Sequence, residues 1–283
     1  MEKLLQESGI DFTLVVSEKP GAPVTLAAEA FEKGFDVVVA AGGDGTVNEV
    51  INGLMTAKLA GRPIASLGVI PAGRGNDFAV SMGIPGDVAH SIKVIAAGQS
   101  KTIDIGQMIG GYYPEGKFLG NGIGFDTIVG FEAAKLPPFL SGMPGYLIAA
   151  VKTIFLYFKA SKMRVVMDQE TLEQPCLIIS VKNGKRMGSS FKMTPKSEPD
   201  DGLFSLMVID QVGRLSMIKL LGKIMSGKQE GHPAVKMPLT GNVQITALTG
   251  SLPVHADGET ICEKGDTITA KIYPKQINLI VEG

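Results

Sequence analysis

Short apolar runs and helical spacings alternate along the first hundred positions of the chain. The run DVVVAA (36–41) is apolar almost throughout, which is typical of a strand buried on both faces of a sheet. The next segment, 46–57, places apolar residues three and four positions apart, and this spacing predicts a helix. The expected elements are strand 12–17, helix 23–34, strand 36–41, helix 46–57, strand and turn 65–73, and helix 87–98. Such alternation predicts a parallel, doubly wound α/β sheet.

The pattern changes near residue 100. Short β-rich runs dominate from there on, and helical patterns interrupt them at 145–158 and 214–226. The β-rich runs are 163–168, 176–181, 203–210, 242–248, 267–273 and 277–282. We therefore expect two domains, an α/β domain in residues 1–100 and a mainly antiparallel β domain in residues 101–283.

The first ten residues, MEKLLQESGI, have the pattern of the back half of a helix. A doubly wound domain normally opens with a strand, and the sequence has no run that would form it. We therefore expect the first strand of the domain to be missing.

Composition narrows the function classes. The 27 basic and 28 acidic side chains leave a formal charge of -1, which does not favour a nucleic-acid surface. The mean hydropathy is +0.21, yet the longest apolar candidate, 146–158, is short and contains Lys152, so it does not predict a membrane span. Cys176 and Cys262 lie far apart in apolar surroundings, which favours reduced, buried thiols and a cytoplasmic protein.

The sequence GGDGT (42–46) directly follows the predicted buried strand and opens the predicted helix. Ligands of open α/β sheets bind where strands end, glycine lets the backbone approach an anion closely, and helix amides donate to it. Asp44 would repel a phosphate unless it holds a Mg²⁺ that the phosphate also binds. A nucleoside triphosphate site explains this combination, and a purely structural glycine turn is the alternative.

The next predicted strand ends in a similar way, with Gly73, Arg74 and Gly75 before Asp77. An ordinary helix cap would also explain the Asn-Asp pair at this position. Adjacent parallel strands would place both glycine turns on one edge of the sheet, with the two aspartates facing a common cleft. Such a pair of carboxylates is costly unless a cation joins them. A third acid, Asp104, lies in a β-patterned run and needs either a salt bridge or a place in the same metal–water cluster.

Six motifs in this order resemble the diacylglycerol-kinase catalytic-domain family, and the match is greatest to its soluble bacterial lipid kinases. The motifs are GGDGTVNEVINGL (42–54), LGVIPAGRGNDFA (67–79), IDIG (103–106), GNGIGFD (120–126), PDDGLFSLMV (199–208) and DGE (257–259). The resemblance covers nearly the whole chain. It implies a Rossmann-like α/β domain of the NAD kinase/diacylglycerol kinase type, followed by a β-sandwich domain, with ATP bound in the cleft between them.

The resemblance also assigns roles to individual residues. Nucleotide binding would involve Ser17, Gly42, Gly43, Asp44, Gly45, Thr46, Asn48, Gly73, Arg74, Gly75 and Asn76. Catalytic Mg²⁺ would be held, largely through water, by Asp44, Asp77 and Asp104. A structural Mg²⁺ would be bound by Asp201 and by the main-chain carbonyls of Glu198 and Leu203.

The DGE motif would supply the acceptor chemistry. By the resemblance, Glu259 acts as general base at a lipid hydroxyl, with Asp257 beside it. A carboxylate near the acceptor and Mg²⁺ near the phosphates are the groups that phosphoryl transfer to an alcohol requires. A simple hairpin turn is the alternative reading of Asp-Gly, and His255 is an alternative base.

The lipid side of the site is expected in residues 135–162. A Pro/Gly loop carrying Leu136, Phe139, Leu140 and Met143 would receive the lipid, near Lys135, Lys159 and Lys162. The helix after it has Leu147, Val151, Ile154 and Phe158 on one face, which either packs on its own domain or contributes to lipid binding. We expect transient, peripheral contact with the inner face of the membrane, and a homodimer is left open.

Three departures from the family pattern and two rival functions remain. The opening strand, with its Asn-Pro and glycine loop, is missing; Arg74 replaces a frequent threonine; and MGSSF (187–191) replaces a glycine-richer stretch. The first rival is an NAD kinase, which shares the Gly-Gly-Asp-Gly loop. The second is a lipid-binding regulatory protein that kept the fold and lost catalysis.

Overall fold

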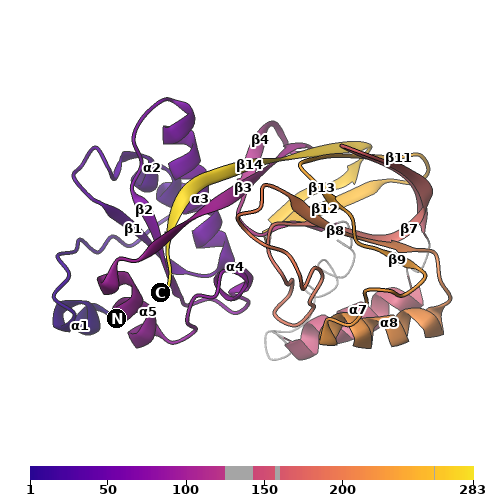
Figure 1. Ribbon diagram of the computed structural model, residues 1–283, viewed down its shortest axis with the longest axis horizontal. Helices are drawn as coiled ribbons and strands as arrows, with labels where there is room; N and C mark the ends of the chain where they lie inside the picture. The colour runs from indigo at the N-terminus through magenta and orange to yellow at the C-terminus, as the bar shows by residue number, and fades with distance from the viewer. Residues whose placement is uncertain (125–142, 157–159, 258) are drawn as a thin grey trace.

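The computed structural model describes residues 1–124, 143–156, 160–257 and 259–283, and Figure 1 shows two lobes joined by long strands. The helices are α1 (Glu2–Glu7), α2 (Ala22–Glu29), α3 (Asp44–Leu59), α4 (Asp77–Ser81), α5 (Val88–Ala97), α7 (Met143–Leu156) and α8 (Arg214–Ser226). The strands of the first lobe and the junction are β1 (Val37–Gly42), β2 (Ser66–Pro71), β3 (Ser100–Gly110), β4 (Tyr113–Leu119) and β5 (Gly122–Gly124). The later strands are β6 (Ser161–Met167), β7 (Thr171–Lys182), β8 (Phe204–Asp210), β9 (Val235–Lys236), β10 (Leu239–Thr240), β11 (Asn242–Ala247), β12 (Leu252–Ala256), β13 (Glu259–Gly265) and β14 (Thr267–Ile280).

The first lobe has the parallel core that the sequence predicts. β1 and β2 pair in parallel, and β14 pairs in parallel with β2 on its other side. Leu67 and Val69 of β2 pack in one core cluster with α3, whereas Ile70 packs in another with α5. Helices therefore cover both faces of this sheet, and the doubly wound α/β fold is confirmed.

Helix α3 follows from the spacing of its apolar residues. Val47, Val50, Ile51 and Leu54 are all at most 4% exposed, and they face the sheet. Because Gly53 lies where a Cβ would come within 2.2 Å of a main-chain oxygen of α2, the two helices pack closely. The packing of α3 fixes the direction in which its first turn points, which is the edge of the sheet where β1 ends.

The expected strand at 12–17 was wrong. These residues form neither strand nor helix, and Leu14, Val15 and Val16 are 45%, 55% and 77% exposed. A strand is stabilised by pairing, and among the described strands β1 pairs only with β2. The segment has the β-branched composition of a strand, but it does not pair with any described strand.

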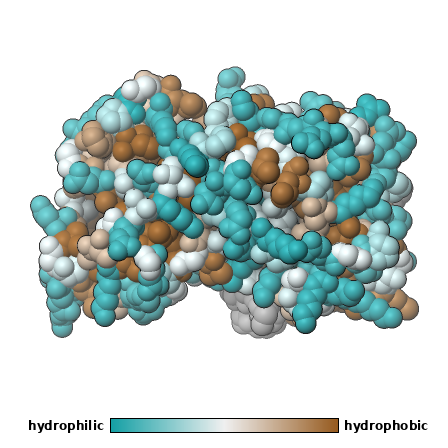
Figure 2. Space-filling view, viewed as in Figure 1, coloured by the Kyte–Doolittle hydropathy of each residue, from teal (hydrophilic) through white to brown (hydrophobic). Residues whose placement is uncertain are grey.

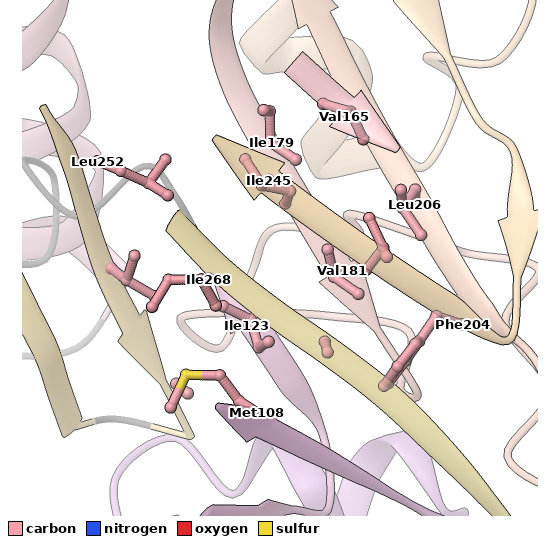
Figure 3. Close-up of a cluster of buried hydrophobic side chains, with 14 of the residues drawn as sticks. Met108, Ile123, Val165, Ile179, Val181, Phe204, Leu206, Ile245, Leu252 and Ile268 are labelled. Carbon is pink, nitrogen blue, oxygen red and sulfur yellow. The ribbon is translucent and has the colours of Figure 1, made fainter. Parts of the chain in front are cut away.

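The second lobe is built from antiparallel strands around one apolar core, as the sequence predicts. Side chains from β3, β5, β6, β7, β8, β11, β12 and β14 meet in this core, and Figure 3 shows how Phe204, Val181 and Ile268 point into it. Helices α7 and α8 pack on each other beneath the strands, and α8 buries its apolar face in a separate cluster that includes Met207 and Ile209 of β8. The second lobe is thus a β-sandwich with a pair of helices on one side.

The two β-rich runs at the end of the sequence form one strand. β14 continues from residue 267 to residue 280 through an irregularity between Tyr273 and Ile277, where Lys275 has a φ of 54°. Its first half packs in the core of the second lobe, and Ile277 and Leu279 pack in that of the first. A single boundary near residue 100 therefore leaves out the return of the chain's last strand to the first lobe (Figure 1).

No helix in the described part of the chain is long and apolar enough to cross a membrane. Figure 2 shows polar residues over much of one face of the molecule, with apolar residues gathered in patches, and an outline that is indented between the lobes. Both cysteines are free and buried, as expected. Burial raises the pKa of the Cys176 thiol to about 11, so this thiol stays protonated near neutral pH.

Candidate active site

The two glycine turns touch each other at the edge of the parallel sheet. Gly42 at the end of β1 lies opposite Pro71 at the end of β2, so the turns that follow leave the sheet side by side. A Cβ on Gly73 would lie 2.3 Å from the Cα of Gly43, a distance that real side chains do not reach. Only glycine fits at this contact, and the expectation that both turns share one edge is confirmed.

The first turn leads directly into α3, which begins at Asp44. The residue before it, Gly43, has no side chain with which to cap the helix, so the first amides of α3 are left for another acceptor. A Cβ on Gly45 would meet nothing within 4 Å, so the approach to the helix start is open at this residue. An uncapped helix start with its positive dipole end is suited to an anion.

Asp44 and Asp77 converge on the second turn. Oδ1 of Asp44 accepts a hydrogen bond from the amide of Phe78 at 2.9 Å, which aims this carboxylate at the start of α4. The Oδ2 atoms of Asp44 and Asp77 lie 3.0 and 3.9 Å from the place that a Cβ on Gly75 would occupy. Burial, and then the charge of Asp44, raise the pKa of the Asp77 carboxyl. A carboxylate that is destabilised by a neighbouring carboxylate is a suitable donor to a divalent cation.

The other residues predicted to bind nucleotide have mixed positions. Arg74 is exposed at the tip of the second turn. Asn76 closes that turn, because its side chain accepts from the amide of Gly73 and donates to the carbonyl of the same residue, both at 3.0 Å. The Thr46 side chain packs beside Gly42, and Ser17 lies exposed in segment 12–17.

Asn48, which was expected to contact phosphate, makes hydrogen bonds within the protein. It is 2% exposed, and its amide donates to the carbonyl of Phe118 and to Oδ2 of Asp257, both at 3.0 Å. It therefore joins α3 to the second lobe. The contact with phosphate expected for Asn48 stays a prediction.

Asp257 lies in the turn between β12 and β13 with a φ of 44°. Its carboxylate accepts hydrogen bonds from the backbone amides of Gly120 at 2.8 Å and Gly122 at 2.9 Å, as well as from Asn48. Asp257 and Glu259 thus lie at the connection between two antiparallel strands, in agreement with the hairpin reading of the motif. The donors around Asp257 occupy both of its oxygens, so this side chain holds the junction of the lobes together.

Glu259 has side-chain partners instead. Its Oε2 forms an ion pair with Lys117 and accepts a hydrogen bond from the hydroxyl of Tyr113 at 3.1 Å. The ammonium of Lys117 also lies 4.8 Å from the centre of the Tyr113 ring, a cation–π contact. Because the side chain of Glu259 is 36% exposed, it is the accessible acid of the motif.

Asp104 lies with the predicted structural metal loop. It is fully buried, and its carboxylate accepts from the amides of Gly202 at 2.6 Å and Lys275 at 2.7 Å. Burial, and then the charges of Asp104, Asp200 and Glu198, raise the pKa of the Asp201 carboxyl above its usual value. The structure therefore brings Asp104 together with Asp201, and it brings Asp44 together with Asp77.

Within residues 1–124, 143–156, 160–257 and 259–283, no group of three or more His, Cys, Asp or Glu side chains is close enough to hold a metal ion directly. The assignment of catalytic Mg²⁺ to Asp44, Asp77 and Asp104 stays a prediction. So does the structural site of Glu198, Asp201 and Leu203.

Some of the expected lipid-binding residues lie outside the described residues. These are Lys135, Leu136, Phe139, Leu140, Phe158 and Lys159; Met143 opens α7, but its side chain is not among those described. Lys162 forms an ion pair with Glu173 at 2.7 Å on β7. On α7, Val151 packs against the cluster around α8, whereas Leu147 is 36% exposed.

Sequence reasoning missed the residues that the second lobe contributes to the edge where the two glycine turns meet. Arg186 and Ser189 both contact Asp77, and the charge of Lys182 acts on the same carboxyl. They lie more than 100 positions from Asp77, and no local pattern marks them. One signal in the sequence lies near these residues, which is the departure of MGSSF (187–191) from the family pattern.

Comparisons with known proteins agree with this arrangement. Residues 1–108 match the family described as the diacylglycerol kinase catalytic domain, and residues 122–281 match the YegS C-terminal NAD kinase beta sandwich-like domain. A diacylglycerol kinase of Staphylococcus saprophyticus is 31% identical over 255 residues, which cover 90% of this chain and 80% of the relative. One of Staphylococcus aureus is 32% identical over 259 residues, covering 90% and 78%.

Solved structures give the same fold. A diacylglycerol kinase from Bacillus anthracis superposes with a TM-score of 0.74 at 19% identity, over 99% of this chain and 88% of that one. An NAD kinase from Archaeoglobus fulgidus in complex with ATP superposes with a TM-score of 0.52 at 15% identity, over 99% and 87%. The family matches and the curated relatives indicate a kinase, and the chain belongs to the diacylglycerol-kinase catalytic-domain family.

Proposed function

We propose that this protein transfers the γ-phosphate of Mg²⁺-bound ATP to the hydroxyl of diacylglycerol or a related lipid. The observation that carries the proposal is the edge where Gly43 and Gly73 touch. An uncapped helix start and two converging carboxylates face the same place there. The helix start is suited to an anion and the pair of carboxylates to a cation. A metal–nucleotide complex supplies both charges. The names of the relatives support a lipid as the acceptor.

In this proposal the residues at the glycine edge orient the donor. The first amides of α3 bind phosphate oxygens, and Asp44 and Asp77 hold Mg²⁺, with Asp104 acting through water. Mg²⁺ supplies charge neutralisation of the phosphates as the bond to the leaving group breaks. The two glycine turns keep the backbone close enough for these contacts.

Glu259 takes the proton of the lipid hydroxyl. Two observations support this role for Glu259. Its side chain is accessible, and its contacts with Lys117 and Tyr113 orient the carboxylate. Asp257 supports it from the same turn by fixing the hairpin to the first lobe. A second Mg²⁺ at Asp201 and the carbonyls of Glu198 and Leu203 would offset the crowding of carboxylates that raises the pKa of Asp201.

A lipid substrate requires transient contact with a membrane, which we place at its cytoplasmic face. Helices α7 and α8 contain no acidic residue. They expose Leu215 and Phe155 at 76% and 55%. A surface that combines exposed apolar side chains with basic residues is suited to the interface of a bilayer with anionic lipids.

Incubation with γ-labelled ATP, Mg²⁺ and a panel of acceptors tests the proposal. The panel contains diacylglycerol, ceramide, a sphingoid base, phosphatidylglycerol and NAD, the lipids being presented in anionic vesicles. We expect label in one lipid product, and none when EDTA removes Mg²⁺. Label in NAD alone would contradict the proposal and favour the rival function, that of an NAD kinase. Lipid binding without transfer of label would favour a regulatory protein.

A further inference from the structure

The segment between β7 and the tip of the following hairpin belongs to the second lobe but is fastened to the first. The amide of Lys185 donates to Oγ of Ser81 in α4 at 3.0 Å, and the amide of Ser189 donates to Oδ1 of Asp77 at 2.9 Å. A Cβ on Gly184 would lie 1.9 Å from the side-chain oxygen of Asn121, so the backbone passes directly against its neighbours. These contacts hold the segment, residues 183–189, as a wall along the edge where the two glycine turns meet.

A tight hairpin directs this wall toward Asp77. Met187 and Phe191 pair across it, and the residues at its tip, Gly188 and Ser189, have φ values of 58° and 67°. A left-handed conformation is unfavourable for serine, and it persists here because it points the amide of Ser189 at the carboxylate.

Arg186 extends from this wall into the second glycine turn. Its Nη2 donates to the carbonyl of Gly75 at 3.0 Å, and its Nε lies 3.2 Å from Oδ1 of Asp77. Among the described residues the buried Nε–H finds no acceptor aligned for a hydrogen bond, in spite of that short distance. The guanidinium thus neutralises part of the charge of Asp77, and its Nε–H lacks an aligned acceptor from the described part of the chain at the edge where the two glycine turns meet.

We propose that Arg186 is a phosphate-binding residue contributed by the second lobe, which neutralises Asp77 until a divalent cation takes over that charge and then donates to the bound nucleotide phosphate. The inference rests on the proposed function, because it requires a metal–nucleotide complex at the glycine edge. A planar guanidinium offers several donors in fixed directions and keeps its charge at all relevant pH values, which suits it to phosphate oxygens. A lysine at the same position would keep the charge and lose the paired donors.

Calorimetric binding of Mg²⁺-ATP to the full chain and to the variants R186M, R186K and R164M tests this. Arg164 pairs with Glu173 on an exposed surface of the second lobe and serves as the matched control. We expect R186M to weaken Mg²⁺-ATP binding by about tenfold, R186K to recover part of the loss, and R164M to leave binding unchanged.

Binding of Mn²⁺ without nucleotide is the second readout. Removal of the competing guanidinium should leave Mn²⁺ binding to R186M as tight as in the unsubstituted protein, or tighter. If R186M and R186K lower only the melting temperature and bind Mg²⁺-ATP normally, Arg186 is a tie between the lobes and the inference is overturned. If the unsubstituted protein binds neither Mg²⁺-ATP nor Mn²⁺, the proposed function itself fails and this inference with it.

Discussion

The Asp44–Asp77 pair and the Asp257 turn are acidic sites on either side of one lobe junction, and their carboxylates have opposite surroundings. Asp257 is enclosed by N–H donors from Gly120, Gly122 and Asn48. Asp77 also has partners in Ser189 and Arg186, but the negative charge of Asp44 lies beside it, and burial and then that charge raise its pKa. Burial raises the pKa of both carboxyls, but only that of Asp77 has a second carboxylate among the causes, and this favours a cation there. Both sites belong to motifs of the same family, so motif membership alone does not separate these two roles.

The largest expected effect is on activity, at the first site. Asp44→Asn keeps the oxygen that accepts from Phe78 and replaces a cation ligand by an amide. We expect labelled phosphate transfer to fall by about 10³-fold and the free energy of unfolding to change by less than about 1 kcal/mol. The exposed Asp36 at the other end of β1 provides the control, Asp36→Asn, which should remain active. Substantial activity in Asp44→Asn would remove the metal role from Asp44.

At the second site we expect a substitution to lower stability markedly. Asp257→Ala leaves the amides of Gly120 and Gly122 and the side chain of Asn48 without their acceptor. The free energy of unfolding should fall by about 3 kcal/mol, as measured by urea titration, because unsatisfied donors near a lobe junction are costly. Asp36→Ala serves again as the surface control. A loss no larger than that of the control would mean that Asp257 is not an anchor and would reopen a catalytic role for it.

A smaller effect is expected where the two glycine turns touch. Gly73→Ala places a Cβ 2.3 Å from the Cα of Gly43, so the turns must move apart. We expect Mg²⁺-ATP binding to weaken by about tenfold or more, since a displaced turn loses amide contacts to phosphate. Gly86→Ala is the matched control, because a Cβ there meets nothing within 4 Å. Equal binding by the two variants would show that contact of the turns is not needed for the nucleotide.

The smallest effect concerns the pH dependence of stability. A carboxyl whose folded-state pKa is raised above its ordinary 3.8, as in Asp77, stabilises the fold fully below its unfolded-state pKa. That contribution is lost as the pH rises through the folded-state pKa. In EDTA, Asp77→Asn should therefore gain stability relative to the unsubstituted protein as the pH rises from about 4 to about 7. Mg²⁺ should reduce this gain, and a difference that is independent of pH would contradict the raised pKa.

The sequence predicts the parts of this molecule that depend on short stretches of chain. The alternation of strand and helix identified the doubly wound sheet, because β1 is a local apolar run and α3 has a local helical spacing. The shared edge of the glycine turns followed from parallel pairing alone. The strand expected at 12–17 failed since pairing depends on a neighbouring strand, which composition does not reveal.

Contacts between distant positions were out of reach. Asn48 looks like part of a phosphate loop, and only the position of β4 and Asp257 shows that it faces the other lobe. Arg186 and Lys117 meet acids 109 and 142 positions away, respectively, and neither lies in a motif. The contacts of these residues depend on how the two lobes pack against each other.

The course of β14 has a consequence for how the protein is made. The parallel sheet of the first lobe includes Leu279, which pairs with Leu67. Although residues 1–100 are translated before β14, their sheet lacks this strand until residues 267–280 have left the ribosome. Contacts of such large sequence separation form slowly, and a partly exposed β2 would await the synthesis of β14. The lobe expected to bind nucleotide is thus translated before the second lobe but completed only when β14 has been made.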